Sequence, residues 1–403
     1  METKKDLKFI FFAMMAWGEG ISGGDKISIE LARRWAKLFP VTVYLWEEGY
    51  RMYMRQNLDP KIINFKLINM NPWKNLGFFV NYLARILAGI LLSLRISLEN
   101  EKNTIVYCAT EFWMDSLPGF ILKLRFPNIT WVTTWFQTAP NPLKGFKEGN
   151  RATSYRFSAL AYWLVQLPIK PLIKRFSDFV LVNNENERKQ FPEMNKKRKV
   201  IVVLGAVDLS LIKNLMKDIK KEEKIYDGVF QGRFHPQKGV MELIDIWKLV
   251  VDEKSDAKLA LIGNGPLMGK VKQRIDELNL QKNIVLFGYV FDGIEKYRIF
   301  SQSKVVLHPA FYDSGGMASA EAMALGLPAV GFDLTAYKSY YPKGMIKVPI
   351  NNMEDFAKEI LRLLRDKKTY SKIGDQAKVM ISKHWSWDSR ADEVLSHILD
   401  QML

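Results

Sequence analysis

Short apolar runs of strand length alternate along the chain with longer amphipathic segments whose apolar positions recur at helical spacing. In the first half, the runs that we interpret as strands are Leu7–Met14, Val41–Trp46, Ile62–Ile68, Thr104–Ala109, Ile129–Thr134, Phe179–Val182 and Val200–Leu204. In the second half they are Gly228–Gln231, Lys258–Ile262, Ile284–Phe287, Val305–His308, Ala329–Gly331 and Ile346–Val348. Two successive strand–helix series predict an α/β protein with two doubly wound, mainly parallel sheets.

Amphipathic helical patterns separate these strands. The segment Lys26–Leu38 places four apolar residues on one helical face, namely Ile27, Leu31, Trp35 and Leu38. Further helices are predicted at Val240–Val251 and Ala318–Leu325. Because α/β proteins bind ligands at the carboxyl ends of their strands, we expect the functional site at those ends, in a cleft between two domains.

Composition is that of an ordinary globular protein, with 48% hydrophobic and 25% charged residues in 403, but the charge is unusual. The net charge is +16, and residues 1–200 carry 30 Lys and Arg against 17 Asp and Glu, whereas residues 201–403 carry 29 against 26. This asymmetry favours a domain boundary near residue 200 and an anionic partner for the first half. Lysine-rich loops that only solvate the surface are an equal alternative for any single cluster.

The amino terminus superficially resembles a signal peptide, because three lysines precede the apolar run Phe9–Trp17. No small-residue cleavage site follows, and a buried first strand leading into a glycine-containing loop fits better. A transmembrane helix is not expected either, because the best segment, Leu76–Leu98, is interrupted by Arg85 and Arg95. A single cysteine, Cys108, excludes an internal disulfide and indicates a cytoplasmic protein.

Two glycine motifs follow predicted strands and open helices. Gly23 and Gly24 precede the first helix, where free backbone N–H groups favour an anion, although glycines at such turns are often purely structural. The second motif runs from Gly232 to Gly239 and contains Arg233 and Lys238, which can converge on a diphosphate. Taken alone, this motif is better explained as an exposed turn with two cations.

Two further motifs lie in the second half. Gly263 and Gly265 stand in the turn Ile262–Pro266, which by itself indicates only a turn. The most specific motif is Phe311–Pro328, in which Asp313 precedes a helix and Glu321 lies in its second turn, among Ala, Met and Leu. A glutamate in such surroundings needs hydrogen-bond partners, for which ribose hydroxyls are suitable; a backbone partner is the alternative.

In combination, and over essentially the whole chain, these motifs resemble the nucleotide-sugar-dependent glycosyltransferases of family 4. The resemblance runs from Gly23 and Gly24, through the segment Leu204–Asp208 near the linker, to the motif ending at Pro328. It implies the GT-B fold: two Rossmann-like domains facing across a cleft and a last helix that crosses back to the first. We therefore expect an acceptor-binding domain at residues 1–205, a nucleotide-sugar-binding domain at 206–385 and a returning helix at 386–403.

The resemblance also implies the activity, namely hexosyl transfer from a UDP- or GDP-sugar to a carbohydrate or lipid-linked acceptor with retention of anomeric configuration. It assigns Arg233 and Lys238 to the diphosphate, Glu321 to the ribose and Asp313 to the transferred sugar. Other residues expected around the sugar donor are Gly23, Gly24, Gly232, Gly263, Gly265, Tyr289, Val290, Ser314, Gly315, Gly316, Met317 and Ala318.

The chain departs from the family pattern at two places. Asp313 stands where the family has Glu, so the carboxylate is one methylene shorter. Many relatives also hold the transferred sugar with a first-domain His, but all four histidines lie in the second half. Trp135 and Gln137 are our candidates to replace it, by stacking and by a hydrogen bond; the alternative is that Trp135 packs the end of its strand.

Breaking a sugar–phosphate bond develops negative charge on the diphosphate, which Arg233, Lys238 and the helix terminus near Gly316 would stabilise. In the front-face mechanism that the resemblance implies, the departing phosphate accepts the acceptor's proton. No Asp-x-Asp triplet occurs, so no metal and no other cofactor is expected. Activity should survive a chelator.

The first half contains basic and aromatic segments, Leu76–Leu98 and Arg151–Phe176, of the kind that suits an anionic membrane surface. We hypothesise peripheral attachment at the inner face of the cell membrane; helices that simply pack on the sheet are the alternative. A nucleic-acid-binding protein is suggested by charge alone, but the corresponding sequence signatures are absent. A degenerate protein that binds nucleotide sugar without transferring it is the remaining alternative.

Overall fold

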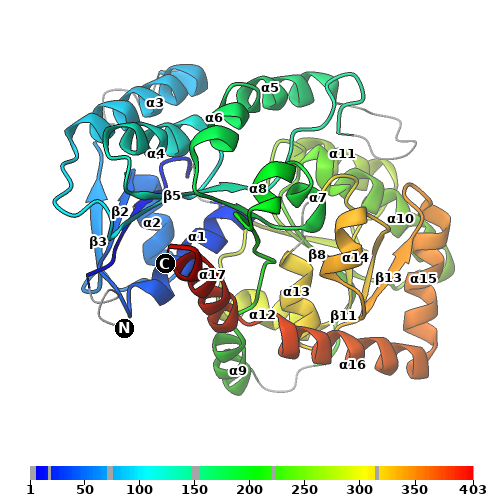
Figure 1. Cartoon of the computed structure of the whole chain (residues 1–403). Helices are drawn as coiled ribbons and strands as arrows, with labels where there is room; N and C mark the ends of the chain where they lie inside the picture. The colour runs from blue at the N-terminus through cyan, green and yellow to red at the C-terminus, as the bar shows by residue number, and fades with distance from the viewer. Residues whose placement is uncertain are drawn as a thin grey trace. The chain divides into compact units, whose positions relative to one another are not determined.

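The computed structural model describes residues 6–16, 20–69, 76–146, 155–219, 223–313 and 317–402 (Figure 1). The chain divides into two compact units. The first comprises residues 1–139, 161–204 and 387–403, and the second comprises residues 140–160 and 205–386. The sequence prediction differs for residues 140–160, which it placed in the first domain. The described residues of this range, 140–146 and 155–160, group with the second unit, where the Phe146 ring contacts His235 and Tyr312.

The first unit contains a seven-stranded parallel sheet with the strand order β3-β2-β1-β4-β5-β6-β7. Its strands are β1 (Lys8–Phe12), β2 (Val41–Leu45), β3 (Ile63–Leu67), β4 (Thr104–Cys108), β5 (Thr130–Trp135), β6 (Phe179–Val182) and β7 (Val200–Val202). Its helices are α1 (Gly23–Trp35), α2 (Glu47–Arg55), α3 (Gly77–Arg95), α4 (Trp113–Arg125), α5 (Arg156–Gln166), α6 (Ile169–Phe176), α7 (Glu185–Arg188), α8 (Pro192–Lys196) and α17 (Trp387–Met402). Only residues 161–166 of α5 belong to this unit.

Both faces of this sheet are covered, which explains why its strands are apolar at almost every position. Alternate residues of β1 point to opposite sides: Phe9 and Phe11 contact aromatic residues such as Trp35 of α1, while Ile10 and Phe12 join a core with α3, α4 and α6. The carboxyl-terminal helix α17 packs against α1, where Arg34 Nε donates to Asp388 Oδ1 at 2.7 Å. Leu38, which was expected on the buried face of α1, lies beyond the helix end and is 60% exposed.

The second unit contains a six-stranded parallel sheet with the order β10-β9-β8-β11-β12-β13. Its strands are β8 (Tyr226–Gln231), β9 (Leu259–Ile262), β10 (Ile284–Gly288), β11 (Ser303–His308), β12 (Ala329–Phe332) and β13 (Met345–Val348). Its helices are α9 (Leu209–Asp218), the short 3-10 helix η3 (Pro236–Lys238), α10 (Val240–Glu253), α11 (Met268–Glu277), α12 (Ile294–Ser301), α13 (Met317–Ala324), α14 (Thr335–Tyr340), α15 (Met353–Arg365) and α16 (Lys367–His384).

Helices α10, α11 and α15 share one hydrophobic core with the strands of this second sheet. Helix α13 contacts α12 and α16. The predicted fold class is confirmed, because both units are doubly wound parallel sheets and all the predicted strands are present with small shifts at their ends. Among the described residues, we find no helix with the length and apolarity needed to cross a membrane.

Candidate functional site

The strand order of the second sheet reverses between β8 and β11, and the loops that follow these two strands meet there. Phe311 N donates to Gln237 O at 2.9 Å, which joins the loop after β11 to the loop after β8. Gly239 makes this approach possible: its φ is +67°, and a Cβ atom would lie 1.8 Å from Pro309 O. Such a reversal is where open α/β sheets hold their ligands, at the carboxyl ends of the strands.

Asp313 is the centre of a charged cluster at this point. Its Oδ2 atom accepts hydrogen bonds from Lys238 Nζ at 2.6 Å, from His308 Nε2 at 2.9 Å and from Tyr337 OH at 3.1 Å. Burial by itself would raise the pKa of Asp313, but Lys238 and His308 hold it well below its usual value. Burial lowers the pKa of His308, so a neutral imidazole donates to an ionised Asp313.

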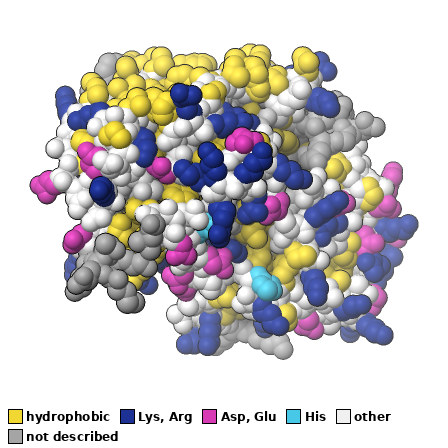
Figure 2. Space-filling view, viewed as in Figure 1, with side chains coloured by type: hydrophobic (Ala, Val, Ile, Leu, Met, Phe, Trp, Pro, Cys, Tyr) yellow, Lys and Arg dark blue, Asp and Glu magenta, His cyan; other side chains and the backbone are white. Residues whose placement is uncertain are grey.

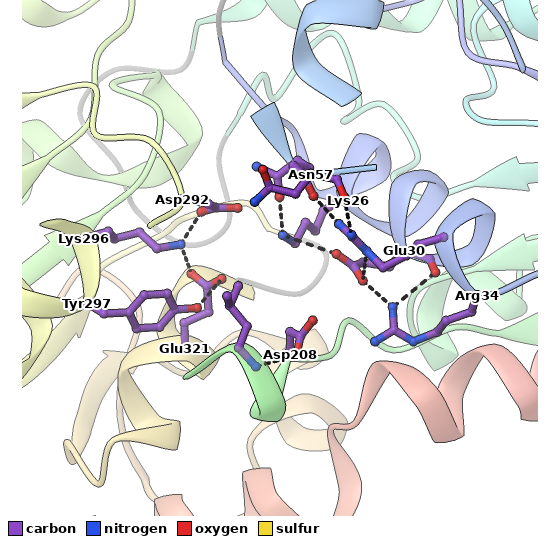
Figure 3. A network of polar contacts seen from close by, with 12 residues as sticks. Lys26, Glu30, Arg34, Asn57, Asp208, Asp292, Lys296, Tyr297 and Glu321 are labelled. Atoms are coloured by element: carbon purple, nitrogen blue, oxygen red, sulfur yellow. Dashed lines mark hydrogen bonds and ion pairs between the residues drawn. The ribbon is translucent and has the colours of Figure 1, made fainter. Parts of the chain in front are cut away.

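Glu321 belongs to a second buried cluster, shown in Figure 3. Its Oε2 atom lies 2.6 Å from Lys296 Nζ, its Oε1 atom accepts from Tyr297 OH at 3.4 Å, and Lys296 also pairs with Asp292. Burial would lower the pKa of Lys296, but the two carboxylates raise it well above its usual value, so the lysine is charged. The expected need for hydrogen-bond partners is therefore met by side chains of α12, and the Glu321 carboxylate is fixed in direction.

Lys296 was missed by the sequence analysis. The available signal is weak: Asp292 lies four residues earlier, a spacing that joins an acid and a lysine across one helical turn. The longer-range pairing with Glu321, 25 residues away, depends on the packing of α12 against α13.

The remaining sequence candidates of the second unit occupy the same loops. Arg233 is exposed in the loop after β8. Gly263 and Gly265 let this loop approach the turn after β9, because Cβ atoms there would lie 1.9 Å from Gly232 O and 2.6 Å from Phe234 O. This packing role is independent of any ligand.

The other candidates lie at the ends of β10 and α13. Tyr289 is 36% exposed, just after β10, and Val290 is buried. Met317 and Ala318 open α13 and are partly exposed. Ser314, Gly315 and Gly316 lie outside the described residues.

Two buried polar atoms near this point have no hydrogen-bond partner among the described residues. They are Oε1 of Gln231, the last residue of β8, and Oγ of Ser319, in the first turn of α13. Buried polar atoms are normally paired, so these two favour a polar ligand beside the Asp313 and Glu321 clusters. Neither was singled out from the sequence, because Gln and Ser at such positions are common.

The first unit corrects one expectation. Trp135 is fully buried, its Nε1 donates to Thr138 Oγ1 at 2.8 Å, and Lys170 Nζ covers its ring at 5.2 Å. The indole therefore packs the end of β5 and offers no face for a sugar. Gln137 is half-buried, and its main-chain O accepts from Tyr162 OH and Gln166 Nε2.

Gly23 and Gly24 open α1 in the first unit. A Cβ atom on Gly24 would lie 3.1 Å from the Phe136 ring. The N-terminus of the helix is already capped, because Ser22 Oγ accepts from Asp25 N while Asp25 Oδ2 accepts from Ser22 N and Oγ. An acid in the first turn makes this helix terminus less favourable for a phosphate than one without it.

No group of three or more His, Cys, Asp or Glu side chains that could hold a metal ion occurs within the described ranges.

Comparison with known proteins finds a family that is similar to part of the second unit. Residues 212–380 match the family model described as "Glycosyl transferases group 1". These residues, less than half of the chain, are similar to the group 1 glycosyl transferases. They contain both the Asp313 and the Glu321 clusters.

Curated relatives are distant and match this chain in part. A poly(glycerol-phosphate) alpha-glucosyltransferase of Bacillus subtilis is 26% identical over 40% of this chain and 24% of its own length. A poly(ribitol-phosphate) alpha-N-acetylglucosaminyltransferase of Staphylococcus aureus is 26% identical over 41% and 34%. An uncharacterized glycosyltransferase of Methanocaldococcus jannaschii is 23% identical over 70% and 67%. The chain thus spans from a quarter to two thirds of the lengths of these relatives.

Solved structures match almost the whole chain in fold. Anabaena HepE in complex with UDP and glucose superposes with a TM-score of 0.71 and 14% identity, covering 98% of this chain and 100% of HepE. A Staphylococcus aureus TarM mutant, in complex with Fondaparinux, alpha-GlcNAc-glycerol and UDP, superposes with a TM-score of 0.71 and 13% identity. The match covers 98% of this chain and 99% of TarM. At this identity the likeness shows the fold, which is the GT-B arrangement of two Rossmann-like domains.

Proposed function

We propose that the chain is a retaining hexosyltransferase that uses a nucleoside diphosphate sugar, UDP- or GDP-linked. The observation that carries the proposal is the meeting of Lys238, Asp313 and His308 at the strand-order reversal of the second sheet, in a segment similar to the group 1 glycosyl transferases. A cation and an ionised acid at one buried point suit a substrate with a negative diphosphate and a sugar rich in hydroxyl groups.

In this proposal the two clusters bind different parts of the sugar donor. Lys238 and the exposed Arg233 bind the diphosphate, and Asp313 accepts a hydrogen bond from a hydroxyl of the transferred sugar. Glu321, oriented by Lys296 and Tyr297, accepts from the ribose hydroxyls. Main-chain amides of Met317 and Ala318, at the start of α13, line the phosphate pocket, Tyr289 and Val290 bracket the base, and the loops at Gly232, Gly263 and Gly265 shape the edge of the pocket.

The ion pair between Lys238 and Asp313 has a consequence for catalysis. Without a sugar donor, Asp313 neutralises Lys238 at 2.6 Å. A diphosphate shares the same ammonium group and is repelled by the nearby carboxylate. As the sugar–phosphate bond breaks, the leaving diphosphate gains charge, so the attraction to Lys238 is largest in the transition state, where it accelerates the reaction.

The acceptor is proposed to be a glycan or a lipid-linked sugar at a membrane surface, bound by residues 1–205, with Gly23, Gly24 and Gln137 near it. The excess of Lys and Arg in residues 1–200 supports an anionic acceptor or surface. Two of the relatives are named for glycerol-phosphate and ribitol-phosphate polymers, which are anionic.

A thermal-shift panel with UDP-, GDP- and ADP-glucose tests the binding part of the proposal. One of the UDP- or GDP-sugars should raise the melting temperature of the wild type and of Lys248→Met, a surface control on α10, but not that of Lys238→Met. Equal shifts in both variants would refute the assignment of Lys238.

Product analysis tests the transfer. The new linkage should keep the donor's anomeric configuration, and activity should persist in EDTA. Binding without any transfer would favour the degenerate, non-transferring alternative instead.

A further inference from the structure

Helix α3 of the first unit buries three polar side chains and leaves a row of apolar side chains exposed. The buried side contains Asn81, Arg85 and Ser93, none more than 4% exposed. The outward side consists of Phe79 (80% exposed), Val80 (40%), Leu83 (59%), Leu87 (60%), Leu91 (53%) and Leu94 (51%). Surface helices normally show the reverse pattern, so the outward side of α3 is built for an apolar contact.

The rotation of α3 about its axis is fixed by the contacts of Arg85. Its guanidinium donates to Ala16 O at 2.6 Å, to Glu48 Oε2 at 2.6 Å and to Asn81 Oδ1 at 2.8 Å. Turning the leucines inward would leave this buried cation without these partners, which is costly. The outward leucines are therefore a stable feature of the first unit.

Neighbouring helices of the same unit extend this surface. Arg125 Nη1 of α4 donates to Ile96 O at the end of α3, at 2.9 Å, and Trp113 Nε1 of α4 donates to Val165 O of α5, at 2.6 Å. Four further exposed residues lie on α4, on α5 and in the turn after α5, namely Leu124, Trp163, Leu164 and Leu167. We call these four residues together with the outward side of α3 the apolar face. Figure 2 shows hydrophobic side chains gathered along the edge where Figure 1 places α3 and α5.

The exposed charged residues of the helices that form the apolar face and of the neighbouring α6 have one sign. In α3, α4, α6 and residues 161–166 of α5, the sequence has one acid, Asp115, and it is fully buried. The exposed charged residues of these helices are the cations Arg95, Arg125, Lys174 and Arg175. An apolar surface whose own helices expose cations and no acid is complementary to an anionic lipid bilayer, whose headgroups attract the cations while the leucines enter the acyl boundary.

We propose that the apolar face docks the first unit on an anionic lipid bilayer, with Leu83, Leu87 and Leu91 inserted and Lys174 and Arg175 at the headgroups. A second copy of the chain is a poorer occupant, because a two-fold contact would bring the same cations together. This proposal rests on the proposed function only in that the acceptor is expected at a membrane. Contact between the apolar face and the bilayer does not require the sugar donor.

The test is sedimentation with vesicles, without sugar donor or acceptor. The full chain should bind vesicles of phosphatidylcholine mixed with phosphatidylglycerol and should bind pure phosphatidylcholine weakly. Leu87→Gln/Leu91→Gln and Lys174→Gln/Arg175→Gln should each bind the mixed vesicles about tenfold more weakly or worse. Binding should fall as salt is raised.

Leu38→Gln is the matched control, because this leucine is 60% exposed beyond α1, outside the apolar face, and its binding should equal that of the wild type. Equal binding by all variants, or wild-type binding to neither vesicle, would overturn the proposal. A wild-type dimer that Leu87→Gln/Leu91→Gln converts to monomer would assign the face to a second copy instead. Thermal shift with the sugar donor on the same variants reports on the proposed function separately.

Discussion

The two sheets reverse their strand order in the same way, but the acids at the two reversals differ. In the first unit, between β1 and β4, Asp115 accepts from Met14 N at 2.5 Å and from Thr110 Oγ1 at 2.6 Å. Burial raises the pKa of Asp115 to about 8, so it is mainly protonated at neutral pH. In the second unit, Asp313 is ionised and paired with Lys238.

This difference favours a structural role for Asp115 and supports the proposed role of Asp313 at the sugar donor. Asp115 joins the loops after β1 and β4 by uncharged hydrogen bonds, and within the described part of the chain it forms no ion pair with a lysine. Asp313 joins the loops after β8 and β11 through a cation that a diphosphate also attracts. The loops at the two reversals therefore differ in their chemistry, and we propose that the sugar donor binds at the second.

Replacing Lys238 should have the largest effect on activity. Lys238→Met removes a cation that stabilises the leaving diphosphate, and kcat/KM should fall about a thousandfold, as for other preorganised charges. Steady-state transfer assays measure this, with Lys248→Met as the control. A loss of less than tenfold would contradict the role of Lys238.

Replacing Lys296 should cost the most stability. Lys296→Met leaves Glu321 and Asp292 without their shared cation in a buried site, so the free energy of unfolding should fall by about 3 kcal/mol. Urea denaturation measures this loss. In the folded fraction, the KM for the sugar donor should rise more than kcat falls, because Glu321 loses its orientation; an unchanged KM would show that Lys296 is purely structural.

The two acids should respond differently to the same substitution. Asp313→Asn removes the carboxylate that competes for Lys238, so UDP should bind about fivefold more tightly while transfer falls at least a hundredfold, by an order-of-magnitude electrostatic argument. Asp115→Asn should change neither by more than about threefold. Calorimetry measures the UDP affinity of both variants, and transfer assays measure their activity. Similar changes in the two variants would contradict the difference in role between Asp115 and Asp313.

The pH dependence of stability should also distinguish them. The pKa of Asp115 in the folded state, about 8, lies above its value in the unfolded chain. The protonated carboxyl therefore stabilises the fold fully below about pH 4, and this stabilisation is lost as the pH rises toward about 8. The free energy of unfolding falls by up to about 1.4 kcal/mol per pH unit for one proton. Asp115→Asn should flatten the wild-type slope of unfolding free energy between about pH 5 and 8 by that amount. Parallel slopes would show that Asp115 is ionised.

The smallest effect is expected at Trp135. Trp135→Phe loses the hydrogen bond to Thr138 Oγ1 and should cost about 1 kcal/mol of stability, with the acceptor KM unchanged. A large rise in the acceptor KM would restore the sugar-stacking role that its burial argues against.

The sequence predicts the fold well because covered parallel strands are apolar runs that differ plainly from amphipathic helices. The sequence also singles out Asp313 and Glu321, because acids beside glycines or among alanines stand out, and their roles toward the sugar donor stay predictions. The sequence does not reveal Lys296, because its partner Glu321 is 25 residues away. It also does not reveal that Trp135 is buried, because tryptophan is equally suited to packing in a core and to stacking on a sugar. Leu38 was misplaced because helical periodicity does not mark where α1 ends.

Residues 77–95 show the same limit in another form. The sequence reveals an apolar helix with Arg85 inside it, but only the contacts of Arg85 establish that the arginine points inward and the leucines outward. Which side of such a helix is buried depends on partners far away in the sequence.

Calorimetric titration of UDP into the full chain and into Lys238→Met, Asp313→Asn and Asp115→Asn tests the central claim most directly. The account predicts weaker binding for Lys238→Met, tighter binding for Asp313→Asn and unchanged binding for Asp115→Asn. Equal affinity in all four proteins, or a loss confined to Asp115→Asn, would contradict a site for the sugar donor at the strand-order reversal of the second sheet.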